Sequence, residues 1–274
     1  MPGRARARAG RLIQRGVMPV DNTIYDLPGD QWWNDDAPLA AIRTALNPGR
    51  LKYLSGVLSE LGINPLGKRV LDVGCGGGLL AEELARLGLR VTGVDPSLPS
   101  LRTARLHADG AALAIEYLVG AGEALPLADA TFDVVVCCDV LEHVTDVERV
   151  ITEISRALRP GGLFVYDTIN RTVASRVVAI NLLQVWEWTR VAPPNLHDWD
   201  RFITPPELIA MMERCGLRSL GYTGLRPSAN PITLFGMLRR RKRGEISSAE
   251  LGRGGVMSLS RDTSILYVGH SRKQ

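Results

Sequence analysis

The most informative segment of the chain reads Val70-Leu71-Asp72-Val73-Gly74-Cys75-Gly76-Gly77-Gly78-Leu79. A short apolar run, typical of a buried strand, passes directly into a glycine-rich turn and then into a helical pattern. Ligands of α/β proteins bind at the carboxyl edge of a parallel sheet, where such a turn lies. Glycine lets the backbone bend sharply and lets a bulky ligand touch main-chain atoms. The segment therefore predicts a ligand site beside the first strand.

The glycine spacing separates this turn from two other nucleotide-binding loops. A dinucleotide fingerprint, G-x-G-x-x-G, would need its third glycine at the position of Leu79. A phosphate-binding P-loop would need Gly-Lys followed by Ser or Thr, which the segment does not contain. The remaining pattern is D-x-G-x-G-x-G, formed by Asp72, Gly74, Gly76 and Gly78.

Strand-like and helix-like segments alternate along the middle of the chain. Short, nearly continuous apolar strands separated by helices predict a doubly wound, mostly parallel sheet covered on both faces, a Rossmann-like α/β fold. Two later strand-like runs have no helix between them and predict an antiparallel pair at one edge of the sheet. We expect strands at 70–74, 90–95, 115–120, 132–140, 163–169, 217–225 and 265–270, and helices at 36–61, 79–88, 101–108 and 147–158.

Asp95 ends the second predicted strand, about twenty residues after the glycine turn. A carboxylate at this position can accept hydrogen bonds from both ribose hydroxyls of a nucleoside. The alternative is that Asp95 caps the following helix, because Pro96 comes next and suits a helix start. Strand position and spacing together favour ribose binding.

The bulk composition predicts an ordinary globular chain. Of its 274 residues, 45% are apolar and 23% are charged, and the net charge is only +4. Its four cysteines form no C-x-x-C pair, which favours a reducing, cytoplasmic setting over disulfides or a zinc site. No apolar run reaches the roughly 18 residues that a spanning helix needs.

Two stretches have unusual charge. Residues 1–16 contain five arginines and no acid, so we predict a disordered basic tail over 1–20, with an organelle transit peptide as the alternative. Five consecutive cations at 239–243 lie within 238–262, which we predict to be a basic loop. The rest of the chain has no nucleic-acid motif, so no nucleic-acid partner is expected. Residues 21–274 are assigned to one domain.

The glycine turn and Asp95 resemble motif I and its acidic partner in the class I S-adenosylmethionine-dependent methyltransferases. An ordered set of further motifs resembles the ubiquinone-biosynthesis O-methyltransferases, the demethylubiquinone 3-O-methyltransferase family. The resemblance implies a seven-stranded sheet, S-adenosylmethionine as cofactor, and methylation of a hydroxyl on a small catechol- or hydroxyquinone-like acceptor, with or without an isoprenoid chain. The motifs are Trp32-Trp33, Asn47-Pro48-Gly49-Arg50-Leu51, Leu141-Glu142-His143-Val144, Asn170-Arg171, His197-Asp198, Phe202-Ile203, Thr223-Gly224-Leu225 and Asn230-Pro231-Ile232.

The resemblance also implies which residues contact the cofactor. A guanidinium binds a carboxylate in a fork, so Arg50 suits the methionine carboxylate, although a surface cation is the alternative. Where the family often has an adenine-contacting acid, this chain has Ala121, so we expect main-chain groups to recognise adenine and Glu123 to cap the turn. The predicted cofactor-binding residues are Arg50, Asp72, Gly74, Gly76, Gly78, Asp95 and Cys138.

In the family an acid-x-x-acid-His run is associated with Mg²⁺, and here that run is Asp139, Glu142 and His143. Carboxylates suit Mg²⁺, whereas a histidine suits a softer metal. The alternative is that these side chains cap the next helix or line the pocket. A phenol, with a pKa of about 10, must lose its proton as it attacks the sulfonium methyl group. His143 and His197 are the predicted proton acceptors.

The segment 172–195 interrupts the strand–helix alternation with an amphipathic, tryptophan-containing stretch. We predict a helical lid over the substrate, with peripheral membrane contact as the alternative, because interfacial Trp flanked by Arg suits a lipid surface. Two other functions stay open on the same fold. One is carbon or nitrogen methylation in a specialised-metabolite pathway, and the other, a non-catalytic binding subunit, is disfavoured by the intact glycine turn.

Overall fold

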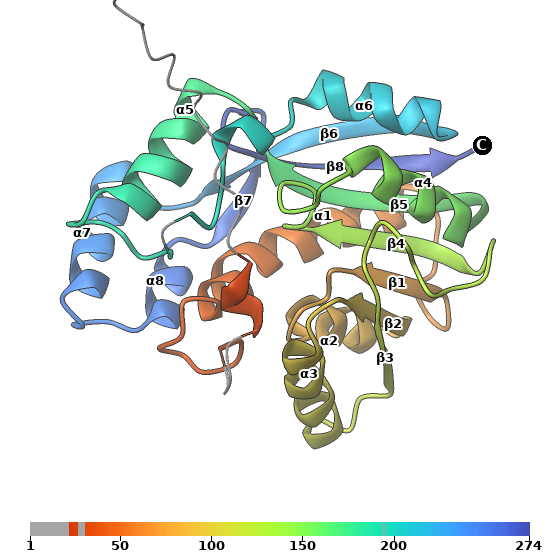
Figure 1. The fold of residues 1–274 in the computed structure, drawn as a ribbon, viewed down its shortest axis with the longest axis horizontal. Coiled ribbons are helices and arrows are strands. Elements are labelled where there is room, and N and C mark those ends of the chain that lie inside the picture. Colours follow the sequence, from red (N-terminus) through yellow and green to blue (C-terminus); the bar gives the residue numbers. More distant parts are fainter. Residues whose placement is uncertain (1–21, 27–30, 194) are drawn as a thin grey trace, which may run out of the picture.

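The computed structural model describes residues 22–26, 31–193 and 195–274, so the basic tail predicted for residues 1–20 lies outside the described residues. The described chain forms one mixed sheet with helices on both faces (Figure 1). Its strands are β1 (Arg69–Val73), β2 (Arg90–Asp95), β3 (Ile115–Val119), β4 (Phe132–Cys138), β5 (Leu158–Ile169), β6 (Leu217–Pro227), β7 (Met257–Ser260) and β8 (Leu266–Lys273).

The strand order is β3-β2-β1-β4-β5-β8-β6-β7. The first five strands pair in parallel, whereas β8 is antiparallel to β5 and β6 is antiparallel to β8, which confirms the predicted antiparallel pair. β7 pairs with β6 and makes the sheet one strand wider than the seven predicted. The chain changes direction across the sheet between β1 and β4, and at such a switch point a crevice opens at the carboxyl ends of the strands.

Helices cover both faces because successive strand residues point to opposite sides. On one face, the apolar cluster that contains Val70 includes side chains of α1 (Asn47–Glu60), α2 (Leu79–Arg86) and α3 (Leu98–Gly110). On the other face, the cluster that contains Leu71 includes side chains of α4 (Val147–Ala157) and α6 (Pro205–Arg214). α2 starts directly after the glycine turn, as predicted. α4 is capped by Asp146, whose side chain accepts a hydrogen bond from the main-chain N–H of Arg149.

The prediction of a loop over 238–262 is wrong. α7 (Pro231–Lys242) extends through the block of cations, and α8 (Ser248–Gly254) and β7 follow it. Arginine and lysine are good helix formers, and cations in the last turn interact favourably with the helix dipole, so the charge alone did not indicate a loop. Arg241 fixes this unit to the N-terminal part of the chain by donating to the main-chain oxygen of Asp36 at 2.7 Å.

The insertion at 172–195 is helical, as predicted. It begins with α5 (Val173–Ser175), which Thr172 caps, and continues as the π-helical segment η3 (Arg176–Val185) before ending in turns. None of the helices in the described ranges is both long and apolar enough to cross a membrane.

An N-terminal strap, residues 22–26 and 31–46, runs beside the carboxyl ends of β1 and β2. It contains η1 (Thr23–Asp26) and η2 (Ile42–Leu46), and η2 leads directly into α1. On one side α8 holds the strap, because the N–H of Ala249 donates to the main-chain oxygen of Asp35 at 3.0 Å. In Figure 1 the strap lies between α8 and the pair α2 and α3.

Candidate active site

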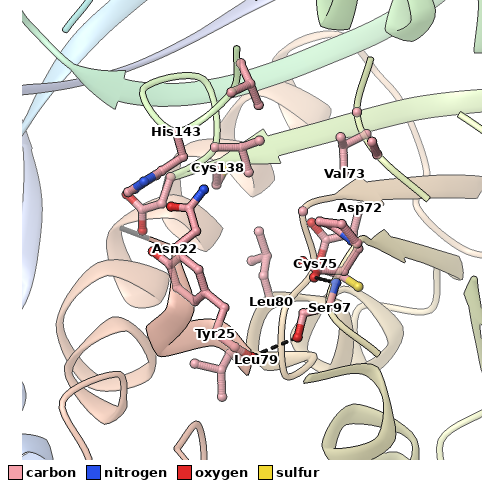
Figure 2. Close-up of a pocket in the computed structure, with 18 of the residues that line it drawn as sticks. Asn22, Tyr25, Asp72, Val73, Cys75, Leu79, Leu80, Ser97, Cys138 and His143 are labelled. Carbon is pink, nitrogen blue, oxygen red and sulfur yellow. Dashed lines mark hydrogen bonds between the residues drawn. The ribbon is translucent and has the colours of Figure 1, made fainter. Parts of the chain in front are cut away.

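A cavity of about 340 Å³ lies at the carboxyl ends of β1, β2 and β4, bounded on one side by the strap (Figure 2). This volume is within the range of small-molecule sites. Of the predicted cofactor-binding residues, Arg50, Asp72, Gly74, Asp95 and Cys138 line the cavity. Gly76 and Gly78 shape the loop beside it.

The loop requires glycine for both backbone and space. Gly74 and Gly76 have φ angles of 72° and 50°, in the left-handed region that side chains rarely adopt. A Cβ atom on Gly74 would lie 2.3 Å from Val140, and one on Gly76 would lie 2.3 Å from the ring of Trp32. The main-chain N–H of Gly74 donates to the oxygen of Val94 at 2.8 Å, which ties the loop to β2.

Asp95 both lines the cavity and braces the loop. Its Oδ2 accepts a hydrogen bond from the N–H of Gly76 and its Oδ1 accepts one from the N–H of Ser97, each at 2.8 Å. Burial raises the pKa of this carboxyl, and the two N–H donors oppose the rise. The alternative role as a helix cap is wrong, because Ser97 caps α3. Each carboxylate oxygen still has a lone pair for a ribose hydroxyl.

Asp72 places a buried carboxyl group at the wall of the same cavity. Its side chain is 2% exposed, and its Oδ2 has no hydrogen-bond partner among the described residues. Burial raises the pKa of the Asp72 carboxyl to about 7; Arg50 opposes this rise and Asp95 adds to it. An unpartnered buried carboxyl is costly, so a cationic group such as the ammonium of the expected cofactor would be stabilised here.

Arg50 is buried and held by a carboxylate that the sequence analysis did not single out. Its Nε and Nη2 donate to the two oxygens of Asp167 at 2.5 and 3.1 Å, its Nη2 also pairs with Asp139, and its Nη1 donates to Asn47 at 3.2 Å. A guanidinium has five N–H donors. These contacts engage four of them, which leaves one on Nη1 for a ligand carboxylate. The sequence did offer one signal for Asp167, because it is an acidic residue inside the apolar run that forms the buried part of β5.

Asp139 does not join the predicted metal triad. It follows β4 with a φ of 54°, and its own N–H donates to Asp167 at 3.0 Å. This left-handed turn directs its carboxylate to Arg50. Instead, ligand atoms of Glu142, His143 and His197 lie within 4.8 Å of one another. We call these three residues the histidine–carboxylate cluster.

Three buried atoms of this cluster lack a hydrogen-bond partner in the described chain: Oε1 of Glu142, Nδ1 of His143 and Nδ1 of His197. The other oxygen of Glu142 accepts from the Thr168 hydroxyl at 2.8 Å. Burial, with Asp139 nearby, raises the pKa of Glu142 to about 8. Burial lowers the pKa of His143 to about 3 and that of His197 to about 4, so both imidazoles are uncharged at neutral pH. His143 lines the cavity, and its ring centre is 5.0 Å from that of His197.

The strap supplies two aromatic residues to the site. The ring of Tyr25 stacks on Trp32 at 5.7 Å and meets the ring of His143 edge-on at 5.9 Å. Burial and the nearby carboxylates, Asp139 first, raise the pKa of Tyr25. The tryptophan pair belongs to a motif of the resemblance, but no role followed from it. Nothing in the sequence indicated Tyr25.

The turn after β3 lies at the cavity. Ala121 and Glu123 line the cavity, and Oε1 of Glu123 accepts from the N–H of Thr145 at 3.1 Å. Glu123 therefore ties this turn to the loop after β4, which differs from the expected role as a cap of its own turn. Adenine recognition by main-chain groups remains a prediction.

Comparisons with known proteins agree with this geometry. Residues 71–166 match a family model described as a methyltransferase domain. A ubiquinone biosynthesis O-methyltransferase from Methylocella silvestris is 42% identical over 222 residues, which are 76% of this chain and 85% of that protein. One from Methylobacterium nodulans is 34% identical over 245 residues, 86% of this chain and 88% of that protein.

A solved structure is similar over most of the chain. The S-adenosylmethionine-dependent methyltransferase structure from Thermotoga maritima has a TM-score of 0.58 at 18% identity, covering 89% of this chain and 93% of that one. At this identity the likeness shows the fold alone, whereas the relatives above share sequence along nearly their whole length. The chain is therefore an S-adenosylmethionine-dependent methyltransferase and belongs to the ubiquinone biosynthesis O-methyltransferase family.

Proposed function

We propose that the enzyme methylates a phenolic oxygen on a catechol- or hydroxyquinone-like ring of a quinone precursor. The observation that carries this proposal is the histidine–carboxylate cluster beside the cofactor cavity, because O-methylation of a phenol requires removal of a proton or stabilisation of the phenolate. The names of the relatives, ubiquinone biosynthesis O-methyltransferases, support the same acceptor class.

The protein contributes to this reaction by aligning the cofactor with the acceptor and by placing charged groups against the cofactor. When bound, S-adenosylmethionine supplies an electrophilic methyl group, so rate depends mainly on orientation and exclusion of water. Asp95 would hold the ribose, Asp72 would face the ammonium group, and the free donor of Arg50 would take the methionine carboxylate. His143, at the far side of the cavity from Asp72 in Figure 2, then marks the place of the acceptor oxygen.

The cluster fits a divalent transition metal better than Mg²⁺. Each buried polar atom without a partner costs about 1–3 kcal/mol, and a single cation would satisfy all three. One carboxylate oxygen and two imidazole nitrogens are ligands typical of Zn²⁺, Mn²⁺ or Fe²⁺, whereas Mg²⁺ prefers oxygen. Glu142, His143 and His197 would hold the ion, which would stabilise the phenolate as a Lewis acid. Histidines with such low pKa values are weak proton acceptors, which also favours the ligand role.

Removing the metal tests this ligand set. We expect dialysis against a strong chelator to lower turnover about a hundredfold, with recovery on adding Zn²⁺ or Mn²⁺ but little on adding Mg²⁺. Elemental analysis should find the metal lost from His197→Ala and retained in His270→Ala, a control in β8 outside the cavity. Full activity without metal would overturn the metal proposal. Glu142, with a pKa of about 8, would then be the proton acceptor.

An exposed apolar surface lies where the insertion meets α7. The rings of Trp186 and Trp188 stack at 5.4 Å, and Trp188 meets Phe235 edge-on at 5.4 Å. Trp188 is 52% exposed and Ile232 is 86% exposed. Interfacial tryptophans suit contact with a lipid surface, and the last turn of α7, the helix that Trp188 contacts through Phe235, carries cations that suit anionic lipid. Peripheral contact of this kind would give access to an acceptor with an isoprenoid chain.

A panel of acceptors tests the function itself. With methyl-labelled cofactor, we expect the label on oxygen, with catechols and hydroxyquinones as the best acceptors. We also expect Trp188→Ser to slow methylation of a prenylated catechol in anionic vesicles about tenfold and to leave a water-soluble analogue unaffected. Label found only on carbon or nitrogen would exclude O-methylation. An equal effect of Trp188→Ser on both acceptors would exclude the lipid contact.

A further inference from the structure

We propose that Tyr25 is a further catalytic residue, whose hydroxyl contacts the methyl group being transferred and aligns it with the acceptor. The inference rests on the proposed function only for the identity of that acceptor. Tyr25 is a strap residue whose main chain is fixed near the ribose end of the reaction path and whose side chain extends to the acceptor end. Three groups of contacts support this.

The main chain of Tyr25 is fixed relative to the ribose-binding carboxylate. Its carbonyl oxygen accepts hydrogen bonds from the hydroxyls of Ser97 and Ser100, at 2.8 and 2.6 Å. Ser97 in turn donates its N–H to Asp95. Ser100 also accepts from the indole N–H of Trp32 at 3.0 Å, which holds the neighbouring part of the strap in the same network. Tyr25 therefore keeps its place whenever Asp95 is in position to bind ribose.

The side chain of Tyr25 spans the gap between this network and the histidine–carboxylate cluster. Figure 2 shows its ring extending from the strap toward His143, across the cavity from Asp72 and Cys75. Stacking on Trp32 fixes the plane of the ring, and the edge contact with His143 fixes the direction in which it points. A two-sided contact of this kind leaves the side chain little freedom.

The position of the sulfonium follows from the two ends of the cofactor. It lies between the ribose, at Asp95, and the methionine group, at Asp72 and Arg50, and its methyl group must face an acceptor near His143. The Tyr25 ring lines the same cavity and extends toward His143. Its oxygen carries partial negative charge, and the C–H bonds of a sulfonium methyl are polarised positively, so a C–H···O contact would be attractive. Such a contact restricts the methyl group to the orientation that the reaction needs.

Tyr25 forms no covalent bond and transfers no proton in this reaction. The acceptor oxygen forms a bond to the methyl carbon while the carbon–sulfur bond breaks, and its electron pair stays on sulfur. The acceptor hydroxyl loses its proton to the histidine–carboxylate cluster or to water beside that cluster. An ordinary tyrosine has a pKa of about 10, so Tyr25 keeps its own proton at neutral pH and acts through position.

The matched pair Tyr25→Phe and Tyr222→Phe tests the proposal, since each loses one oxygen and Tyr222 is 43% exposed on β6. For Tyr25→Phe we expect kcat to fall about tenfold to a hundredfold, with the cofactor Kd within about threefold of the unchanged enzyme. In NMR spectra with ¹³C-methyl cofactor, the bound methyl protons should move upfield in Tyr25→Phe and stay in place in Tyr222→Phe. The ring contacts remain, so the melting temperature should change little.

The outcomes separate this inference from the proposed function. An unchanged kcat together with an unchanged methyl resonance in Tyr25→Phe would overturn the role of Tyr25. A Tyr25→Phe variant that loses cofactor affinity and kcat in equal measure would overturn it as well, because the hydroxyl would then serve binding alone. If the unaltered enzyme methylates no phenol, the acceptor assignment fails, while the methyl resonance, which needs no acceptor, still tests Tyr25.

Discussion

Asp95→Ala is expected to raise the Kd for S-adenosylmethionine about a thousandfold. Two charge-assisted hydrogen bonds to the ribose would be lost, each worth about 1.5–3 kcal/mol, and every 1.4 kcal/mol is about tenfold in affinity. The glycine loop would also lose its brace, because Asp95 accepts the N–H groups of Gly76 and Ser97. Titration calorimetry gives the Kd directly, and methylation should fall in parallel at any cofactor concentration below the new Kd.

Two further variants serve as comparisons for Asp95→Ala. Asp109→Ala removes an exposed carboxylate from the last turn of α3 and should leave the Kd unchanged. Asp95→Asn should bind nearly as weakly as Asp95→Ala, since an amide has a single oxygen to accept and its NH₂ would face an N–H donor. An Asp95→Ala variant that binds cofactor like the unaltered enzyme would remove the basis for the ribose assignment.

The fold and the meeting of Asp72, Gly74 and Asp95 at one cavity could be predicted because their signals are local. The strand–turn–helix pattern at 70–79 and the aspartate that ends the next strand lie within short windows, and the parallel sheet follows from alternation. The antiparallel pairing of β6 and β8 was predicted correctly, but the expectation of no helix between them was wrong, because α7 and α8 lie there. β7 was missed because it has four residues and follows a segment whose charge concealed two helices.

The acceptor side could not be predicted in the same way, because it is assembled from distant segments. Sequence proximity grouped Asp139 with Glu142 and His143, but a left-handed backbone turn directs Asp139 to Arg50. His197 takes its place from a loop beyond the insertion. Tyr25 reaches the cavity through hydrogen bonds to residues more than seventy positions away, at Ser97 and Ser100. Contacts between residues so far apart in the chain produce no periodic pattern in a single sequence.

Arg50→Met is expected to lower the free energy of unfolding by about 3–5 kcal/mol, because it leaves a fully buried carboxylate at Asp167 without its counter-charge. Burial already raises the pKa of Asp167 and Arg50 opposes that rise, so the variant should raise it further. A carboxyl whose folded pKa lies above its unfolded value loses stability as pH rises between the two. The deficit of Arg50→Met, measured by urea unfolding, should therefore be smaller at pH 5 than at pH 8. Arg102→Met, exposed on α3, is the control.

The double variant Arg50→Met/Asp167→Asn distinguishes support of the fold from contact with the cofactor. Removing both charges should recover at least half of the lost stability, because the neutral amide that replaces the Asp167 carboxylate no longer needs a counter-ion in the interior. It should not restore cofactor affinity, since no guanidinium remains for the methionine carboxylate. If the double variant binds S-adenosylmethionine as tightly as the unaltered enzyme, Arg50 holds β5 and the end of β4 in place and does not touch the cofactor. The methionine carboxylate would then have to be bound by the main-chain N–H groups of the glycine loop.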